Sequence, residues 1–213
     1  LKAPNGSTVV SPTSTVAYDL IKTNGLTEAQ VATALGLDGV SILSFNPYAA
    51  GVDANTALAV EKVASQVMTT VKTIAAAAEG TGANVEDAAN QAFDSIVTVL
   101  QSKVSSSETL NFANTTDLTS VKAQAKSKLA SLSGIDTTSF NTTLDTAMDS
   151  VKLVNDVINN ITDTNLTSNA NKGVFAAADH LKTQTKTAAT AEKATPGSGN
   201  QHITMNDADA VNT

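Results

Sequence analysis

Residues 60–80, VEKVASQVMTTVKTIAAAAEG, decide the fold of this chain. Aliphatic residues and alanine recur through the stretch at intervals of three and four: Val60, Val63, Val67, Val71, Ile74 and Ala78. This spacing puts them on one face of an α-helix, and the glycine at position 80 ends the pattern. The apolar face is narrow and the other faces are neutral and polar. Such a helix is marginal alone and must be covered by other helices.

Similar patterns occur on both sides of this stretch. Toward the N-terminus, Ser11 followed by Pro12 indicates a helix start, because proline favours the first helical position. Thr27 and Gln30 form a capping box that opens a second, short helix. Toward the C-terminus, Asn84 is the predicted cap of a helix that extends to Val104. Further helical patterns cover residues 118–132, 140–161 and 167–191.

These patterns predict a mainly α fold, an antiparallel helical bundle with extended N- and C-terminal segments. Short links that contain Gly and Asn favour antiparallel neighbours. We divide the chain into an extended entry segment, residues 1–10, a helical bundle domain, residues 11–193, and a C-terminal segment, residues 194–213. That last segment begins with a linker, TPGSGNQ, and its alternating HITM sequence indicates the start of a following β module.

The apolar stripes, the rows of apolar residues along one face of each predicted helix, also predict which side chains are buried. Five residues lie in the middle of a stripe and are expected to share the core: Val67, Ile96, Leu129, Val154 and Phe175. Residues 183–191, TQTKTAATA, are instead expected to form a solvated helix face that includes Thr185. A flat Thr/Ala surface of the kind that binds ice is the alternative, but the run is short and lacks a long regular repeat.

The composition excludes several classes of function. The chain has no Arg, Cys or Trp, and Thr, Ser and Asn make up about a third of it. Without Cys it forms neither disulfides nor thiolate metal sites. A net charge of −7 argues against nucleic acid and anionic membrane surfaces as partners. No apolar run reaches the roughly 18 residues that a spanning helix needs, so we expect no membrane insertion.

No residue pattern predicts catalysis or cofactor binding. The two histidines, His180 and His202, have no partners nearby in the sequence that would form a metal or acid–base site. The sequence Gly80-Thr81-Gly82 follows a helix and lacks a succeeding Lys-Ser/Thr pair, so it predicts a loop between helices rather than a phosphate-binding loop. We therefore expect a protein that is not an enzyme.

One acidic cluster near the C-terminus is a candidate metal site. Asn206, Asp207 and Asp209 offer closely spaced oxygen ligands of the kind that calcium prefers. The glycine and glutamate of an EF-hand loop are missing. A calcium site here requires the remaining ligands to come from a neighbouring domain, and the alternative is an ordinary polar turn.

The N-terminal sequence resembles a known kind of module. Residues 1–37, LKAPNGSTVVSPTSTVAYDLIKTNGLTEAQVATALGL, are followed by GVSILSFNPYAA at residues 39–50. This phrase resembles helical segments of very large, repetitive bacterial surface and secreted proteins of the adhesin or RTX type, which Ig-like or cadherin-like β repeats flank. The resemblance covers about residues 1–52 and brings no functional residues with it. It implies an extracellular module in a larger adhesive or matrix-forming chain.

We therefore expect a non-enzymatic structural or adhesive module of a large extracellular protein on the bacterial cell surface. Both ends of the sequence suggest a longer polypeptide. The expected partners are neighbouring domains of the same chain, other copies of it, and surface glycans or proteins. Two alternatives stay open: a subunit of a polymeric surface layer or extracellular filament, and a module that binds a small ligand in a pocket between its helices.

Overall fold

A computed structural model describes residues 1–204 and confirms the mainly α fold. Within those residues there are seven α-helices, a closing 3₁₀ turn and no β-strand. The helices are α1 (Pro12–Asn24), α2 (Glu28–Ala34), α3 (Ala54–Gly80), α4 (Val85–Ser105), α5 (Thr115–Leu129), α6 (Thr137–Asn159) and α7 (Asn169–Ala194), and the turn is η1 (Asn200–His202).

Local sequence sets where the first helices begin. The Ser11 hydroxyl accepts a hydrogen bond from the backbone N–H of Ser14 at 3.1 Å, and the Ser14 hydroxyl accepts one from the Ser11 N–H at 2.8 Å. Thr27 and Gln30 form the same reciprocal pair at the start of α2. Asn84 caps α4 through its side-chain oxygen. All three predicted helix starts are therefore confirmed, because each depends only on residues that are close in sequence.

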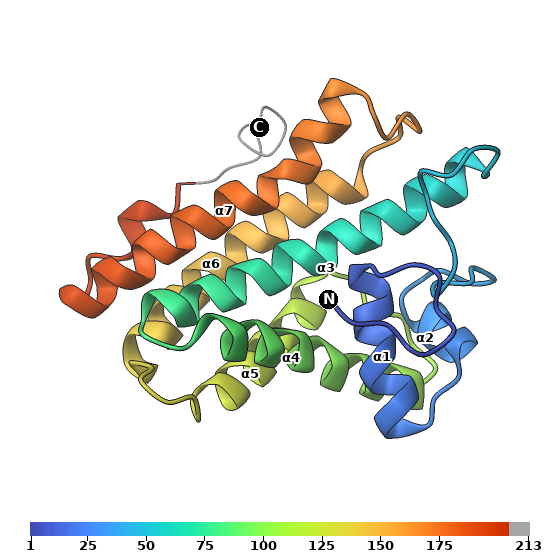
Figure 1. The fold of residues 1–213 in the computed structure, drawn as a ribbon. Coiled ribbons are helices and arrows are strands. Elements are labelled where there is room, and N and C mark those ends of the chain that lie inside the picture. Colours follow the sequence, from blue (N-terminus) through green and yellow to red (C-terminus); the bar gives the residue numbers. More distant parts are fainter. Residues whose placement is uncertain (205–213) are drawn as a thin grey trace.

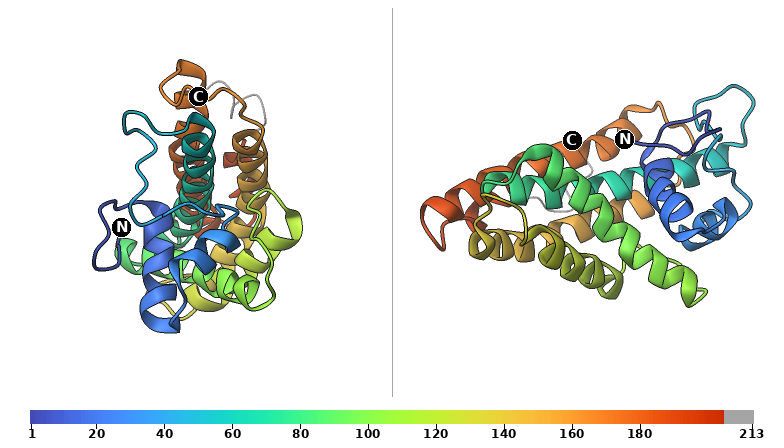
Figure 2. Two further views of the ribbon diagram at one scale, coloured as in Figure 1. Left: turned by 90° about the vertical axis from the view of Figure 1, so that its right-hand side faces the viewer. Right: turned by 60° about the horizontal axis from the view of Figure 1, so that its bottom comes forward.

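Three long helices, α3, α6 and α7, lie side by side, with α4 and α5 beneath them and α1 and α2 at one end (Figure 1). The molecule is longer along these three helices than across them, as Figure 2 shows. Residue pairing gives the directions. Lys62 and Gln66 of α3 donate to the carbonyls of Asn159 and Asn155 of α6, so these two helices are antiparallel.

The α3–α7 pair, by contrast, is parallel. Lys72 binds Asp179 and Glu79 binds Lys186, so residue numbers rise together along the two helices. Consecutive long helices are antiparallel, as predicted from the short links. The parallel contact arises because α7 is placed beside α3 after four reversals of the chain.

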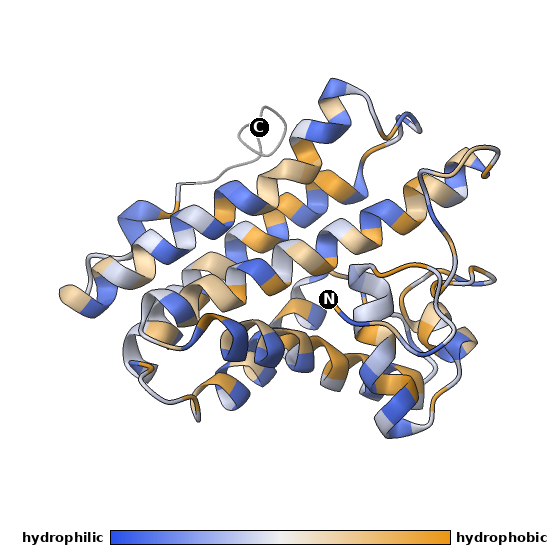
Figure 3. Ribbon diagram, in the orientation of Figure 1, coloured by the Kyte–Doolittle hydropathy of each residue, from blue (hydrophilic) through white to orange (hydrophobic). Residues whose placement is uncertain are grey.

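The predicted core is correct for four of its five residues. Val67, Ile96, Leu129 and Val154 are fully buried, and their helices surround one apolar cluster. Along every long helix, hydrophobic positions are interspersed with pale or hydrophilic ones, as expected for narrow apolar stripes (Figure 3). The fifth residue, Phe175, is only partly buried because it lies at the edge of a surface groove described below.

The prediction that Thr185 is solvated is wrong. Its side chain is 0% exposed and its hydroxyl has no hydrogen-bond partner. Thr185 follows Leu181 by four residues and precedes Ala189 by four, so it continues the buried stripe of α7. Composition alone suggested a polar face, but the phase of the helix turns this threonine into the interior of the bundle.

The close approach of α3 and α7 depends on small side chains. A Cβ atom added to Gly80 would lie 2.6 Å from the Cβ of Ala189 and 2.7 Å from the carbonyl oxygen of Lys186. Buried threonines of α3 satisfy their own hydroxyls within the helix: Thr69, Thr70 and Thr73 each donate to the carbonyl four residues earlier at 2.8–2.9 Å. The buried faces of α3 therefore contain hydroxyl groups that are hydrogen-bonded within the helix itself.

Both end segments are hydrogen-bonded to the helices. At the N-terminus, Lys2 exchanges backbone bonds with the Thr15 hydroxyl at 3.0 Å, and the N–H groups of Thr8 and Val9 donate to the Leu43 carbonyl. These contacts hold the entry segment, which forms no helix or strand, against α1 and the loop before α3.

The described part of the C-terminal segment folds back along α7. The Glu192 carboxylate, only 5% exposed, accepts the N–H groups of Gly197 and Gly199, each at 2.9 Å. The Thr204 N–H donates to Gln184 at 3.2 Å. Residues 195–204 thus pack on the bundle where a linker was predicted, and His202 ends a 3₁₀ turn. The predicted β module remains a prediction, because the sequence after residue 204 lies outside the described residues.

Candidate functional site

The predicted calcium ligands, Asn206, Asp207 and Asp209, lie outside the described residues. Among residues 1–204, no three His, Cys, Asp or Glu side chains are grouped so that they could hold a metal ion. The calcium site therefore stays a prediction.

The two histidines lie on α7 and on the segment that returns along it. A hydrogen bond of 3.0 Å joins the His180 ring to the Gln184 amide, which also donates to the Thr204 hydroxyl at 3.1 Å. His202 is half-buried and borders a surface hollow together with Lys182 and Lys186. The structure gives His180 an amide neighbour that orients its ring.

The Gly80-Thr81-Gly82 loop has a packing role. Gly82 has φ +114°, and a Cβ atom there would clash with the carbonyl oxygen of Gly134. The Thr81 carbonyl accepts the Asp136 N–H at 3.0 Å and the Lys193 ammonium at 2.9 Å. The loop between α3 and α4 therefore joins the start of α6 to the end of α7, as a connection between packed helices.

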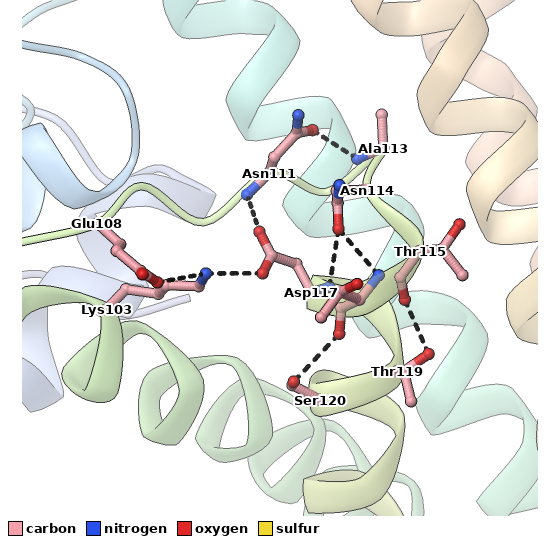
Figure 4. Close-up of polar contacts among 10 residues, drawn as sticks. Lys103, Glu108, Asn111, Ala113, Asn114, Thr115, Asp117, Thr119 and Ser120 are labelled. Atoms are coloured by element: carbon pink, nitrogen blue, oxygen red, sulfur yellow. Dashed lines mark hydrogen bonds and ion pairs between the residues drawn. The ribbon is translucent and has the colours of Figure 1, made fainter. Parts of the chain in front are cut away.

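A polar cluster fixes the loop between α4 and α5 (Figure 4). The Lys103 ammonium lies 2.8 Å from Asp117 Oδ1 and 2.9 Å from Glu108 Oε2. The second Asp117 oxygen accepts the Asn111 N–H at 2.8 Å, and the Asn114 side chain caps α5. The bonds to Asp117 and Glu108 raise the pKa of Lys103. Because these charges satisfy one another, we assign the cluster a structural role.

That role is to place Phe112 in the core. Phe112 is 2% exposed, and its carbonyl accepts the side-chain amide of Asn155 at 2.9 Å. Asn155 is itself fully buried on α6, and its amide also lies 3.4 Å from the Thr70 hydroxyl of α3. One asparagine therefore connects the α4–α5 loop, α6 and α3 inside the bundle.

The best candidate for a binding site is a groove beside α3. We call it the α3 groove; it has a volume of about 400 Å³, and its walls come from the entry segment, the loop before α3, α3 and α7. The wall residues that matter here are Val10, Phe45, Tyr48, Glu61, Met68 and Phe175. Its volume lies within the usual range for small-molecule pockets, about 300–1,000 Å³.

Helical spacing places a polar stripe of α3 along the groove. Glu61, Ser65, Met68 and Lys72 follow one another at intervals of four, three and four, so they share one face. Eleven residues at 1.5 Å each separate the first from the last by about 16 Å. Lys72 at one end is paired with Asp179 at 2.7 Å. The other end carries Glu61.

Glu61 is a half-buried carboxylate with hydroxyl neighbours. The Ser65 hydroxyl donates to Glu61 Oε1 at 3.4 Å, and the Tyr48 hydroxyl is a second donor. Burial raises the pKa of Glu61. No lysine of the described residues lies within ion-pair distance of it. Burial, with a contribution from the Glu61 charge, raises the pKa of Tyr48 to about 12.

The rim of the groove is unusually apolar for this surface. Val10 and Tyr48 are 60% and 57% exposed, and among the described residues they are two of only four large hydrophobic side chains with that much exposure. The groove thus combines an unpaired acid with aromatic and aliphatic walls. These are groups that bind and orient an organic molecule.

Sequence reasoning did not identify Glu61 or Tyr48. The available signal was an acid directly after Val60, beside an otherwise neutral apolar stripe. Its partner Tyr48 lies in the connector before α3, and only the tertiary structure brings the two together. Comparison of the chain with protein-family models, curated proteins and solved structures gives no match. No helix in residues 1–204 is both long and apolar enough to cross a bilayer.

Proposed function

We propose that this chain is a non-enzymatic structural and adhesive module of a large extracellular protein on the bacterial surface, and that the α3 groove is its binding face. The proposal is supported by the acidic, cysteine-free composition and by the resemblance of the N-terminal sequence to such modules. Neighbouring domains of the same chain, other copies, and surface glycans or proteins are the proposed partners.

The observation that best supports the proposal is which part of the sequence forms the wall of the groove. Val10, Phe45 and Tyr48, which form one wall, all belong to the N-terminal phrase that resembles the surface-protein module. The opposite wall is α3, which begins just after that phrase. An exposed valine and tyrosine beside an unpaired carboxylate fit a binding surface better than a merely solvated one.

Protease treatment of intact bacteria that carry the native protein tests the location. A surface module is released as peptides from living cells, and mass spectrometry then detects sequences such as residues 62–72, while a cytoplasmic marker protein stays intact. If these peptides appear only after lysis, the proposal is wrong.

Electron microscopy and sedimentation of native material separate the proposal from its polymeric alternative. A module within a large chain gives single elongated particles. A subunit of a surface layer or filament gives a regular polymer with a repeating spacing, and that result would favour the alternative.

A further inference from the structure

We propose that the α3 groove binds a small organic cation, with an ammonium group at Glu61 and an apolar body against Phe45, Tyr48 and Met68. This inference rests on the groove's being the binding face proposed above. It adds the chemical class of the ligand, which follows from the charge and the shape of the groove.

The first argument is charge. The two buried carboxylates of the described residues have strong partners: Asp117 binds Lys103, and Glu192 accepts two backbone N–H groups. Glu61 has only the hydroxyls of Ser65 and Tyr48. A buried charge is stabilised most by an opposite charge that is also hydrogen-bonded to it. An ammonium ligand supplies both.

The second argument concerns the opposite end of the stripe. Lys72 is the cation of the groove, and its ammonium is already bound to Asp179 at 2.7 Å. An anionic ligand would have to share that ammonium with the Asp179 carboxylate and would also approach the carboxylate of Glu61. The arrangement therefore disfavours anions.

The third argument is the apolar lining. The rings of Phe45 and Tyr48 and the thioether of Met68 border the same space as Glu61. Aromatic faces attract ammonium groups, and flexible methionine side chains adapt to small apolar bodies. The groove therefore has a place for each half of an amphipathic cation.

The chain offers a direct probe of this site. It has no Trp and two Tyr, so the Tyr18→Phe variant leaves Tyr48 as its single tyrosine fluorophore. This variant is titrated with hexylammonium chloride, with the uncharged 1-hexanol and with sodium hexanoate, while Tyr48 emission is recorded. Calorimetry on the unmodified chain repeats the three titrations without any substitution.

We expect hexylammonium to bind about tenfold more tightly than hexanol, since a hydrogen bond to a charged partner is worth about that factor. Hexanoate should bind more weakly still. Glu61→Gln should abolish the preference for the cation. Glu86→Gln removes the same charge from an exposed site on α4 away from the groove and should retain the preference. Circular dichroism verifies that each variant is folded.

Equal binding of the three probes, or a preference that survives Glu61→Gln, would overturn the ligand class while leaving the groove as a binding face. Absence of binding by all three would overturn both the ligand class and the groove. The protease experiment on intact cells tests the surface location independently of either result.

Discussion

Replacing Gly80 by Ala tests the close contact between α3 and α7. The new Cβ would lie 2.6 Å from the Ala189 Cβ, 2.7 Å from the Lys186 carbonyl oxygen and 3.2 Å from the Thr190 nitrogen. Carbon atoms in contact are ordinarily about 3.5–4.0 Å apart, so about 1 Å is missing. Two of the three obstacles are backbone atoms of α7. No side-chain rotation relieves them, and the helices must move apart.

The expected cost follows from two opposing effects. Overpacking of this kind costs about 1–3 kcal/mol. Alanine is a better helix former than glycine by about 1 kcal/mol in a helix interior, but Gly80 is the last residue of α3 and gains less. We expect Gly80→Ala to lower the free energy of unfolding by about 2 kcal/mol, a large share of the usual 5–15 kcal/mol.

Urea unfolding followed by circular dichroism measures this change. The Ala189→Gly substitution in the Gly80→Ala background removes the nearest obstacle, so the pair should show a favourable coupling of about 1 kcal/mol in a double-mutant cycle. The rescue is partial because the Lys186 carbonyl remains. A Gly80→Ala variant as stable as the parent, or a cycle without coupling, would refute the proposed distance between α3 and α7.

Three further results are expected. In the Tyr18→Phe variant, the phenolate absorbance of Tyr48 should titrate with a midpoint of about 12, and Glu61→Gln should lower that midpoint. Because the pKa of Tyr48 is raised from 10.0, the stability that its protonated hydroxyl contributes is complete below pH 10 and is lost as the pH rises through 12. A midpoint at 10 would contradict the structure. Burial also raises the pKa of Glu61, so Glu61→Gln should leave urea stability near pH 7 unchanged or higher. That advantage fades as the pH falls through the raised pKa of the native carboxyl and is gone below the ordinary value of 4.5, and a clear loss near pH 7 would show that the charge is stabilising. Asn155→Ala leaves the Phe112 carbonyl without its side-chain donor and opens a cavity. The free energy of unfolding, measured by denaturant titration, should therefore fall by about 2–4 kcal/mol. A change within experimental error would mean that the hydrogen bond from Asn155 to Phe112 is dispensable.

Much of the fold could be predicted from local sequence. Ser11 with Pro12, Thr27 with Gln30, and Asn84 each define a helix start within four residues, and the structure confirms them. The spacing around Val67 also identified the central helix. Helix ends were less accurate: α5 ends at Leu129, three residues before the predicted end.

What the sequence could not provide is the choice between faces of similar polarity. Thr185 belongs to a run of Thr and Ala in which neither face is distinctly apolar, so composition pointed to solvent, whereas the helix phase places this residue in the interior of the bundle. The α3 groove could not be predicted from the sequence for a different reason. Tyr48 and Glu61 are separated by the start of α3, and their contact depends on how the connector folds back on the helix.

The internally bonded threonines of α3 have a thermal consequence. When α3 and α7 separate, the surfaces that meet water carry hydroxyls and single methyl groups as well as larger hydrocarbon side chains. Apolar exposure raises the heat capacity of unfolding and polar exposure lowers it. We therefore expect this chain to have a small heat-capacity change for its length and a flat stability curve. Such a protein loses little stability on cooling.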